Sequence, residues 1–155
     1  MVVRNESQAL CVAVEMERRA IRVYERALML AKDAQVISGV QEILADERRH
    51  LARFSEMHAC HQLDASEEKL LISAMAADVL FTGGVMEMKR EQALATLRGL
   101  YQYAADSEAG AVRTYAEFAQ KCDDPAVKET FLSIVREEST HLAELKNRIA
   151  ALEQV

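Results

Sequence analysis

The chain has few of the residues that break helices or that stabilise small secreted domains. Its 155 residues include five glycines, one proline, no tryptophan and only three cysteines. Since no Cys-x-x-Cys pair occurs, a zinc-ribbon or rubredoxin-like module is excluded, and the scattered cysteines favour a reducing compartment. The abundant residues, such as Ala, Leu, Glu and Arg, are good helix formers. The composition therefore predicts an all-α protein.

Long apolar runs and a basic surface are also missing. The apolar stretch nearest the N-terminus, residues 9–14, is too short for a signal peptide, and no run reaches the length of a transmembrane helix. The net charge of −6 argues against a nucleic-acid partner. A chain of this length can bury one hydrophobic core. We therefore expect a single cytoplasmic domain over residues 1–155, with neither a membrane nor a nucleic acid as partner.

Four stretches place apolar residues three or four positions apart, as amphipathic helices do. Asp33 and Asp124 stand at the N-cap positions of the second and fourth stretch, and Pro125 occupies a first helical position. The connections within the first pair and within the second pair are therefore very short, so each pair must be an antiparallel hairpin. The four inward series run from Leu10 to Ala31, Val36 to His61, Leu94 to Phe118 and Val127 to Leu152.

The segment between the hairpins, residues 62–90, has a different character. It contains a helix start signal at 64–68, an apolar patch from Leu70 to Phe81 and a stop at Thr82-Gly83-Gly84. A connection of this length can run back along a helix of ~25 residues, which is ~37 Å long. We predict a four-helix bundle of two antiparallel hairpins, joined by a long crossover that contains a short helix. Whether the apolar patch covers the bundle or a second chain stays open.

Four polar residues of the first hairpin recur 91 positions later in the second. Glu17, Tyr24, Glu47 and His50 correspond to Glu108, Tyr115, Glu138 and His141. A shared apolar pattern alone does not explain the identities between segments 17–52 and 108–143, because many of them are polar. A duplication with pseudo-twofold symmetry is the natural account. Eleven residues of the first segment are identical to the residue 91 positions later: Glu17, Ala20, Arg22, Tyr24, Asp33, Val36, Ile43, Glu47, His50, Leu51 and Ala52.

The repeat places charged residues where a bundle core normally has Leu or Ile. Buried carboxylates repel one another and are costly to bury unless cations compensate their charge. Each Glu-x-x-His puts a carboxylate and an imidazole on one helical face. This mixed nitrogen and oxygen set suits two iron or manganese ions, with zinc as a competitor. The predicted ligands, which would also be the catalytic residues, are Glu17, Glu47, His50, Glu108, Glu138 and His141.

Other interpretations of these residues stay open at this stage. The second block could be a duplicate that has lost its metal, or a register slip could turn the polar residues outward. Tyr24 and Tyr115 lie two turns from the first Glu of each block and are expected to orient ligand carboxylates, although they could be ordinary buried aromatics. We expect His58, Cys60 and His61 to lie at the end of the bundle rather than in a second metal site. Cys11 and Cys122 are expected to be buried thiols.

With these two blocks the chain resembles the rubrerythrin-like branch of the ferritin-like di-iron superfamily, over roughly residues 6–154. One Glu from each of two helices and a Glu-x-x-His from each of the other two is the arrangement of di-iron bundles. The resemblance implies that Glu17 and Glu108 are terminal ligands and that Glu47 and Glu138 bridge two iron ions. His50 and His141 would each bind one iron. A homodimer is also implied.

The chain departs from full rubrerythrins in two respects. It contains no rubredoxin domain, and Ala111 stands where rubrerythrins carry an extra Glu three residues after the ligand of the third helix. The resemblance implies reduction of peroxide or dioxygen at a diferrous/diferric centre, with electrons from a separate partner. The alternatives are a ferroxidase or iron storage or delivery protein, and a non-catalytic bundle that is stabilised by metal.

Overall fold

The computed structural model describes residues 3–80 and 89–154, and all regular secondary structure in these two ranges is helical. The predicted all-α class is therefore confirmed for the described part of the chain. The helices are α1 (Glu6–Leu30), α2 (Ala34–Cys60), α3 (Ala65–Leu80), α5 (Leu97–Gln120) and α6 (Pro125–Glu153), with a further helical segment at 89–93.

Side-chain caps determine where the second helix of each hairpin begins. The Asp33 carboxylate accepts hydrogen bonds from backbone N–H groups in the first turn of α2, and Asp124 does the same for α6. Pro125 follows its cap directly, where the missing N–H costs no hydrogen bond. Both caps were predicted, and they leave connections of only residues 31–33 and 121–124.

The third long helix begins slightly later than its apolar series. Thr96 caps α5 by accepting a hydrogen bond from the N–H of Gly99, so the helix starts at Leu97. Leu94, the first residue of the predicted series, lies in the turn before the helix and is nevertheless buried. The apolar pattern therefore begins before the first residue of the helix, because the preceding turn also packs against the core.

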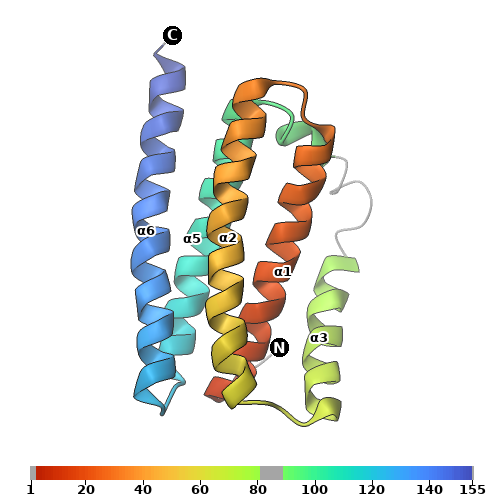
Figure 1. Ribbon diagram of the computed structural model, residues 1–155, viewed down its shortest axis with the longest axis vertical. Coiled ribbons are helices and arrows are strands. Elements are labelled where there is room, and N and C mark those ends of the chain that lie inside the picture. Colours follow the sequence, from red (N-terminus) through yellow and green to blue (C-terminus); the bar gives the residue numbers. More distant parts are fainter. Residues whose placement is uncertain (1–2, 81–88, 155) are drawn as a thin grey trace.

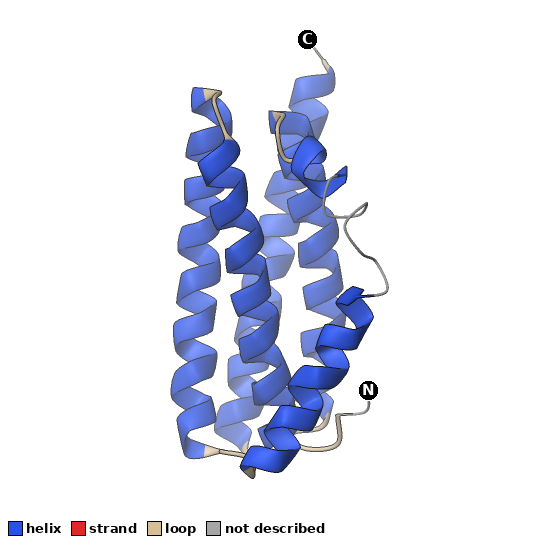
Figure 2. Ribbon diagram, turned by 90° about the vertical axis from the view of Figure 1, so that its right-hand side faces the viewer, coloured by secondary structure: helices blue, strands red, loops and turns tan. Residues whose placement is uncertain are grey.

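The long helices form two hairpins that pack side by side (Figure 1). Helices α1 and α2 make one hairpin, and α5 and α6 make the other, with the closest packing inside each pair. Helices α2 and α5 run in the same direction, as the long crossover predicted. Helix α3 lies outside the bundle against α1, as both views show (Figures 1 and 2).

The interior consists of two apolar clusters with a polar layer between them. One cluster contains the aromatic group of Phe54, Tyr115, Phe118 and Phe131. The other is mainly aliphatic and includes Ile21, Val40, Leu44, Leu100 and Leu145. Leu51 packs against both. Every long helix thus buries one apolar stripe, and each stripe is interrupted by charged residues at the same level.

Helix α3 buries only part of the predicted apolar patch. Leu71 and Met75 are buried, whereas Leu70 has 71% of its surface exposed. The rest of the predicted patch and its stop signal extend to Phe81 and to residues 82–84, which lie outside the described residues. No helix in the described ranges is both long enough and apolar enough to cross a membrane.

Candidate metal centre

All six predicted ligands lie in the polar layer between the two apolar clusters. Five are buried: Glu17, Glu47, His50, Glu108 and Glu138. The sixth, His141, keeps 23% of its side chain exposed. The predicted inward register is therefore confirmed, and a register slip that turns these side chains outward is ruled out.

The six side chains form two overlapping groups that could each hold a metal ion. Glu17, Glu47, His50 and Glu138 offer ligand atoms within 4.8 Å of one another, and so do Glu108, Glu138 and His141. Glu138 belongs to both groups, which is the position of a bridging carboxylate. Glu47, the other predicted bridge, belongs to the first group alone. The two imidazole rings lie nearly parallel, with centroids 6.5 Å apart.

Short distances connect the imidazoles to the carboxylates inside each group. His50 Nδ1 lies 3.1 Å from Glu138 Oε1 and 4.0 Å from Glu17 Oε1. On the opposite side, His141 Nδ1 lies 3.9 Å from Glu108 Oε1. Both histidines therefore turn Nδ1 toward the carboxylates, as the pseudo-twofold symmetry of the sequence requires.

Glu17, Glu47 and Glu108 hold their protons more tightly than ordinary glutamates do. Burial raises the pKa of Glu17 and of Glu47, two neighbouring carboxyl groups in the same layer. Burial, followed by the negative charges of Glu138 and Glu47, raises the pKa of Glu108 to about 9. Burial alone would lower the pKa of His50, but Glu138 and Glu47 outweigh it and raise that pKa. The close approach of these carboxyl groups therefore disfavours their ionised forms unless a cation compensates the charge.

The unsatisfied atoms of the site coincide with its potential ligand atoms. Among the described residues, one carboxylate oxygen each of Glu17, Glu108 and Glu138 is buried without a hydrogen-bond partner, and so is Nδ1 of His50 and of His141. Buried polar atoms normally find a partner, and each exception requires an explanation. Oxygen and imidazole nitrogen atoms that converge in this way fit two divalent or trivalent metal ions.

Two acidic residues outside the predicted set lie next to the Nε2 atoms of the imidazoles, on the side away from the carboxylates of the site. His50 Nε2 lies 3.0 Å from Glu137 Oε2, and His141 Nε2 lies 3.6 Å from Asp46 Oδ2. An ionised carboxylate only accepts hydrogen bonds, so the Glu137 contact favours a proton on His50 Nε2 and leaves its Nδ1 free to bind metal, whereas the longer Asp46 contact is not a hydrogen bond. Asp46 and Glu137 are themselves 91 residues apart. Sequence reasoning missed them because they differ in type and face away from the inward series.

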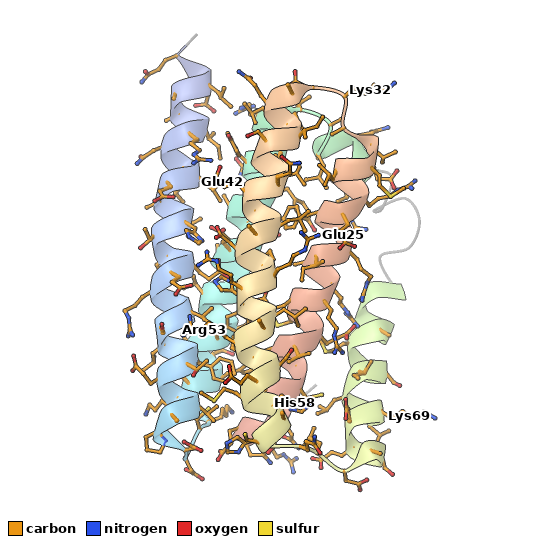
Figure 3. All side chains as sticks on the ribbon, viewed as in Figure 1. Glu25, Lys32, Glu42, Arg53, His58 and Lys69 are labelled. Carbon is orange, nitrogen blue, oxygen red and sulfur yellow. The ribbon has the colours of Figure 1, made fainter. Side chains whose placement is uncertain are left out.

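Arginines of α2 complete both outer contacts. Arg53 Nη1 donates to Glu137 Oε1 over 3.0 Å, and Arg49 pairs with Asp46. Burial would raise the pKa of Glu137, but the His50 contact and Arg53 lower it, so this carboxylate stays ionised. Arg53 lies on the α2–α6 side of the bundle (Figure 3). Beside each histidine there is thus a carboxylate that is paired with an arginine nearer the surface.

The two tyrosines of the repeat make different contacts. The Tyr115 hydroxyl donates to Glu17 Oε1 over 2.8 Å, which orients a ligand carboxylate of the other hairpin. Tyr24 instead packs edge-on against Tyr103, and no hydrogen bond from its hydroxyl to a ligand carboxylate is found in the described part of the chain. The predicted orienting role therefore has a structural basis for Tyr115 alone.

A cavity of about 450 Å³ between α1 and α5 reaches the carboxylates; we call it the α1–α5 cavity. Glu17, Glu47, Glu108 and Glu138 form its polar end. Small residues, Ala111 among them, keep it open. Its remaining lining includes Met16, Ala20, Val23 and the cations Arg19, Arg90 and Arg113. A small molecule could therefore approach the centre from this side.

A second, much smaller opening lies on the opposite side, beside His141. Glu42, Asp46, Glu108 and Glu144 line it together with His141. Glu42 projects on the α2–α6 side of the bundle, where Figure 3 labels it, and it is paired with Arg148. This acidic opening explains the exposed edge of His141, and it suits the passage of a cation better than that of an anion.

The remaining predicted residues lie at the end of the bundle. His61 Nε2 is 3.1 Å from Asp124 Oδ2, the N-cap of α6. Cys60 is exposed, and Cys11 and Cys122 are buried thiols, as expected.

Comparisons with family models, curated proteins and solved structures find no match to this chain.

Proposed function

We propose that the chain is a rubrerythrin-like member of the ferritin-like superfamily that holds two iron ions and reduces peroxide, or dioxygen, with electrons from a separate partner. The observation that carries this proposal is the convergence of four buried carboxylates and two imidazoles from two repeated hairpins. Two divalent ions would balance the four carboxylate charges. A diferrous pair supplies the two electrons that, with two protons, convert hydrogen peroxide into two water molecules.

The protein's own residues support this chemistry in three ways. Glu137 accepts a hydrogen bond from His50 Nε2, so that Nδ1 would face the metals, and Asp46 lies in the corresponding place beside His141 Nε2. The Tyr115 hydroxyl fixes the carboxylate of Glu17. Apolar clusters above and below the site exclude bulk water from all but its two openings. The metal pair would therefore be held rigidly while one side stays accessible.

The α1–α5 cavity supports a small oxidant as the substrate. It has room for several molecules of water size, each of which occupies ~30 Å³ in the liquid. Since Ala111 replaces the extra Glu of the family, more space is left at the carboxylate end. A small neutral molecule could reach the metals there without displacing a side chain.

An anaerobic titration of the metal-free protein with Fe(II), followed by one addition of hydrogen peroxide, tests the proposal. We expect two irons per chain, a rapid near-ultraviolet absorption band and the disappearance of one peroxide per iron pair. A His141→Ala variant should lose half of the bound iron and the rapid band. His61→Ala is the matched control, because His61 lies at the bundle end, and it should behave as the wild type does.

The proposal fails if the protein binds no stoichiometric iron. Tight binding of two irons without oxidation would instead establish the non-catalytic bundle. Repeated additions of peroxide and a surrogate reductant would show whether the centre turns over. This is the most stringent part of the test, because Ala111 stands where rubrerythrins carry an extra Glu.

The acidic opening beside His141 favours a second candidate function, the oxidation of Fe(II) delivered from solution. Glu42, Asp46 and Glu144 outnumber the single cation Arg148 in its lining, so the opening would draw ferrous ions toward the centre. Under this hypothesis, excess Fe(II) and dioxygen give many turnovers per chain, and Glu144→Gln slows iron uptake without changing the final stoichiometry. A single turnover that stops at two irons would exclude it. Storage of iron would further require a very large assembly, which size-exclusion chromatography would detect.

A further inference from the structure

Three side chains from three different helices meet at the end of the bundle, well away from the dinuclear site. Cys11 comes from α1, His58 from the last turn of α2 and Glu68 from the first turns of α3. Their ligand atoms all lie within 4.8 Å of one another. Figure 3 labels His58 at this end of α2, beside α1 and α3. None of the three belongs to the polar layer described above.

The cluster contains a buried atom with no partner. Nδ1 of His58 is shielded from solvent and, among the described residues, has no hydrogen-bond partner. Cys11 is only 3% exposed. A buried imidazole nitrogen beside a buried thiol and a carboxylate is costly unless something binds them together. Nothing in the dinuclear centre accounts for this arrangement.

We propose that Cys11, His58 and Glu68 form a second, mononuclear site for a thiophilic divalent cation, of which Zn²⁺ fits best. Zinc accepts sulfur, imidazole nitrogen and carboxylate oxygen as ligands, with bonds of ~2.0–2.3 Å. Neighbouring ligand atoms of such a tetrahedron are ~3.5 Å apart, so the three groups need only small movements to close around the ion. Water would take the fourth position.

The charges around the cluster support a cation. Glu15 and Glu67, as well as Glu68, act on the Cys11 thiol as negative charges, and Arg18 is the main opposing one. Burial, with these charges, raises the pKa of Cys11 to about 11, so the thiol is protonated in the metal-free protein. Binding replaces the S–H bond with an S–Zn bond and releases one proton to solvent, so the affinity should rise with pH.

Such an ion would attach the crossover helix to the bundle. Helix α3 packs mainly on α1 and keeps Leu70 exposed, so its apolar contact is limited. A metal that joins α1, α2 and α3 would restrict α3 at its first turns. Because Met75 of the same helix lines the α1–α5 cavity, the site would also steady one wall of the access route.

Titration of the full-length metal-free protein with Co²⁺ as the probe tests this site directly. Only a cysteine ligand gives sulfur-to-cobalt charge transfer in the near ultraviolet, and the dinuclear site has no sulfur. We expect this band to saturate at one thiolate-bound cobalt per chain and to disappear when Zn²⁺ is added. Its presence or absence is therefore independent of the iron chemistry proposed above.

Matched variants assign the band to the three residues. Cys11→Ala should abolish it. His58→Ala and Glu68→Gln should weaken binding by more than ~100-fold, because even the loss of an outer partner of a metal ligand costs ~10–100-fold. Cys122→Ser is the control for a buried thiol, Cys60→Ser for the exposed thiol, and Glu67→Gln for a neighbouring carboxylate that is bound to Gln8. All three controls should keep the band.

Two results would overturn the proposal: no charge-transfer band in the wild-type protein, or a band that survives Cys11→Ala. Loss of the band in Cys60→Ser would equally refute it, because the exposed thiol would then be the ligand. Far-ultraviolet circular dichroism checks that each variant is folded. Should Cys11→Ala fail to fold, His58→Ala, at a partly exposed position, still decides the question.

Discussion

Replacing Glu108 by Gln should stabilise the metal-free protein while removing its response to metal. Burial and the charges of Glu138 and Glu47 raise the pKa of Glu108 from 4.5 to about 9. The folded, metal-free protein therefore keeps a proton on Glu108 at neutral pH, whereas the unfolded chain releases it. Glutamine imitates the protonated carboxyl group in shape and carries no ionisable proton.

The sign and size of the effect follow from this difference in proton binding. A group whose pKa is raised on folding contributes full stability below pH 4.5 and loses it as the pH rises toward 9. At ~1.4 kcal/mol per pH unit, the wild-type protein loses at most ~3 kcal/mol by pH 7 and ~6 kcal/mol by pH 9 from this residue. The Gln variant avoids that loss.

Urea unfolding of chelator-treated protein at about pH 5, 7 and 9 measures the effect. The advantage of Glu108→Gln over the wild type should be small at the lowest pH and grow with each step. Glu117→Gln, an exposed position on the same helix, should stay within ~0.5 kcal/mol of wild type throughout. Saturating Mn²⁺ should raise the stability of the wild type and of Glu117→Gln far more than that of Glu108→Gln.

Two outcomes would refute the reasoning. A Glu108→Gln variant that is less stable than wild type at about pH 9 would mean that the carboxylate is ionised and stabilised in the metal-free protein. An advantage that is equal at all three pH values would mean that packing, rather than proton binding, determines the difference.

Two further predictions concern the residues around the candidate metal centre. Tyr115→Phe removes the donor to Glu17 and should destabilise the metal-free protein by ~1–3 kcal/mol, as calorimetry would show, whereas Tyr24→Phe should cost less because its hydroxyl has no carboxylate partner. Equal losses in the two variants would contradict the asymmetry between them. Glu137→Gln should weaken binding of one metal ion by ~10–100-fold in a competition titration. Unchanged affinity would show that Glu137 serves only its ion pair with Arg53.

The sequence by itself determined the helices and the level of the polar layer. Apolar spacing, the Asp33 and Asp124 caps and Pro125 each depend on interactions within a few residues, so they can be recognised without a structure. The parallel course of α2 and α5 followed from the length of the crossover. The inward position of Glu47 and Glu138 followed from their register with apolar neighbours, because the helical period fixes which face a residue shares.

The tertiary structure alone decided which atoms meet across the helices. Helical period gives the face but not the depth, the tilt or the rotation of one hairpin against the other. It therefore could not show that Glu138 is shared by both ligand groups while Glu47 belongs to one, or that His141 is exposed and His50 is not. Nor could it predict that Tyr115 reaches Glu17 while Tyr24 turns to Tyr103.

The same limit applies to the groups that lie outside the repeat. Asp46 and Glu137 became visible only when the packing of α2 against α6 brought each behind the histidine of the opposite hairpin. Cys11 lies far from the other two in the sequence, and His58 and Glu68 stand in different helices with no metal-binding motif spacing between them. The packing of α1 against both α2 and α3 brings them together, since a contact between three helices depends on distances in space that no local pattern records.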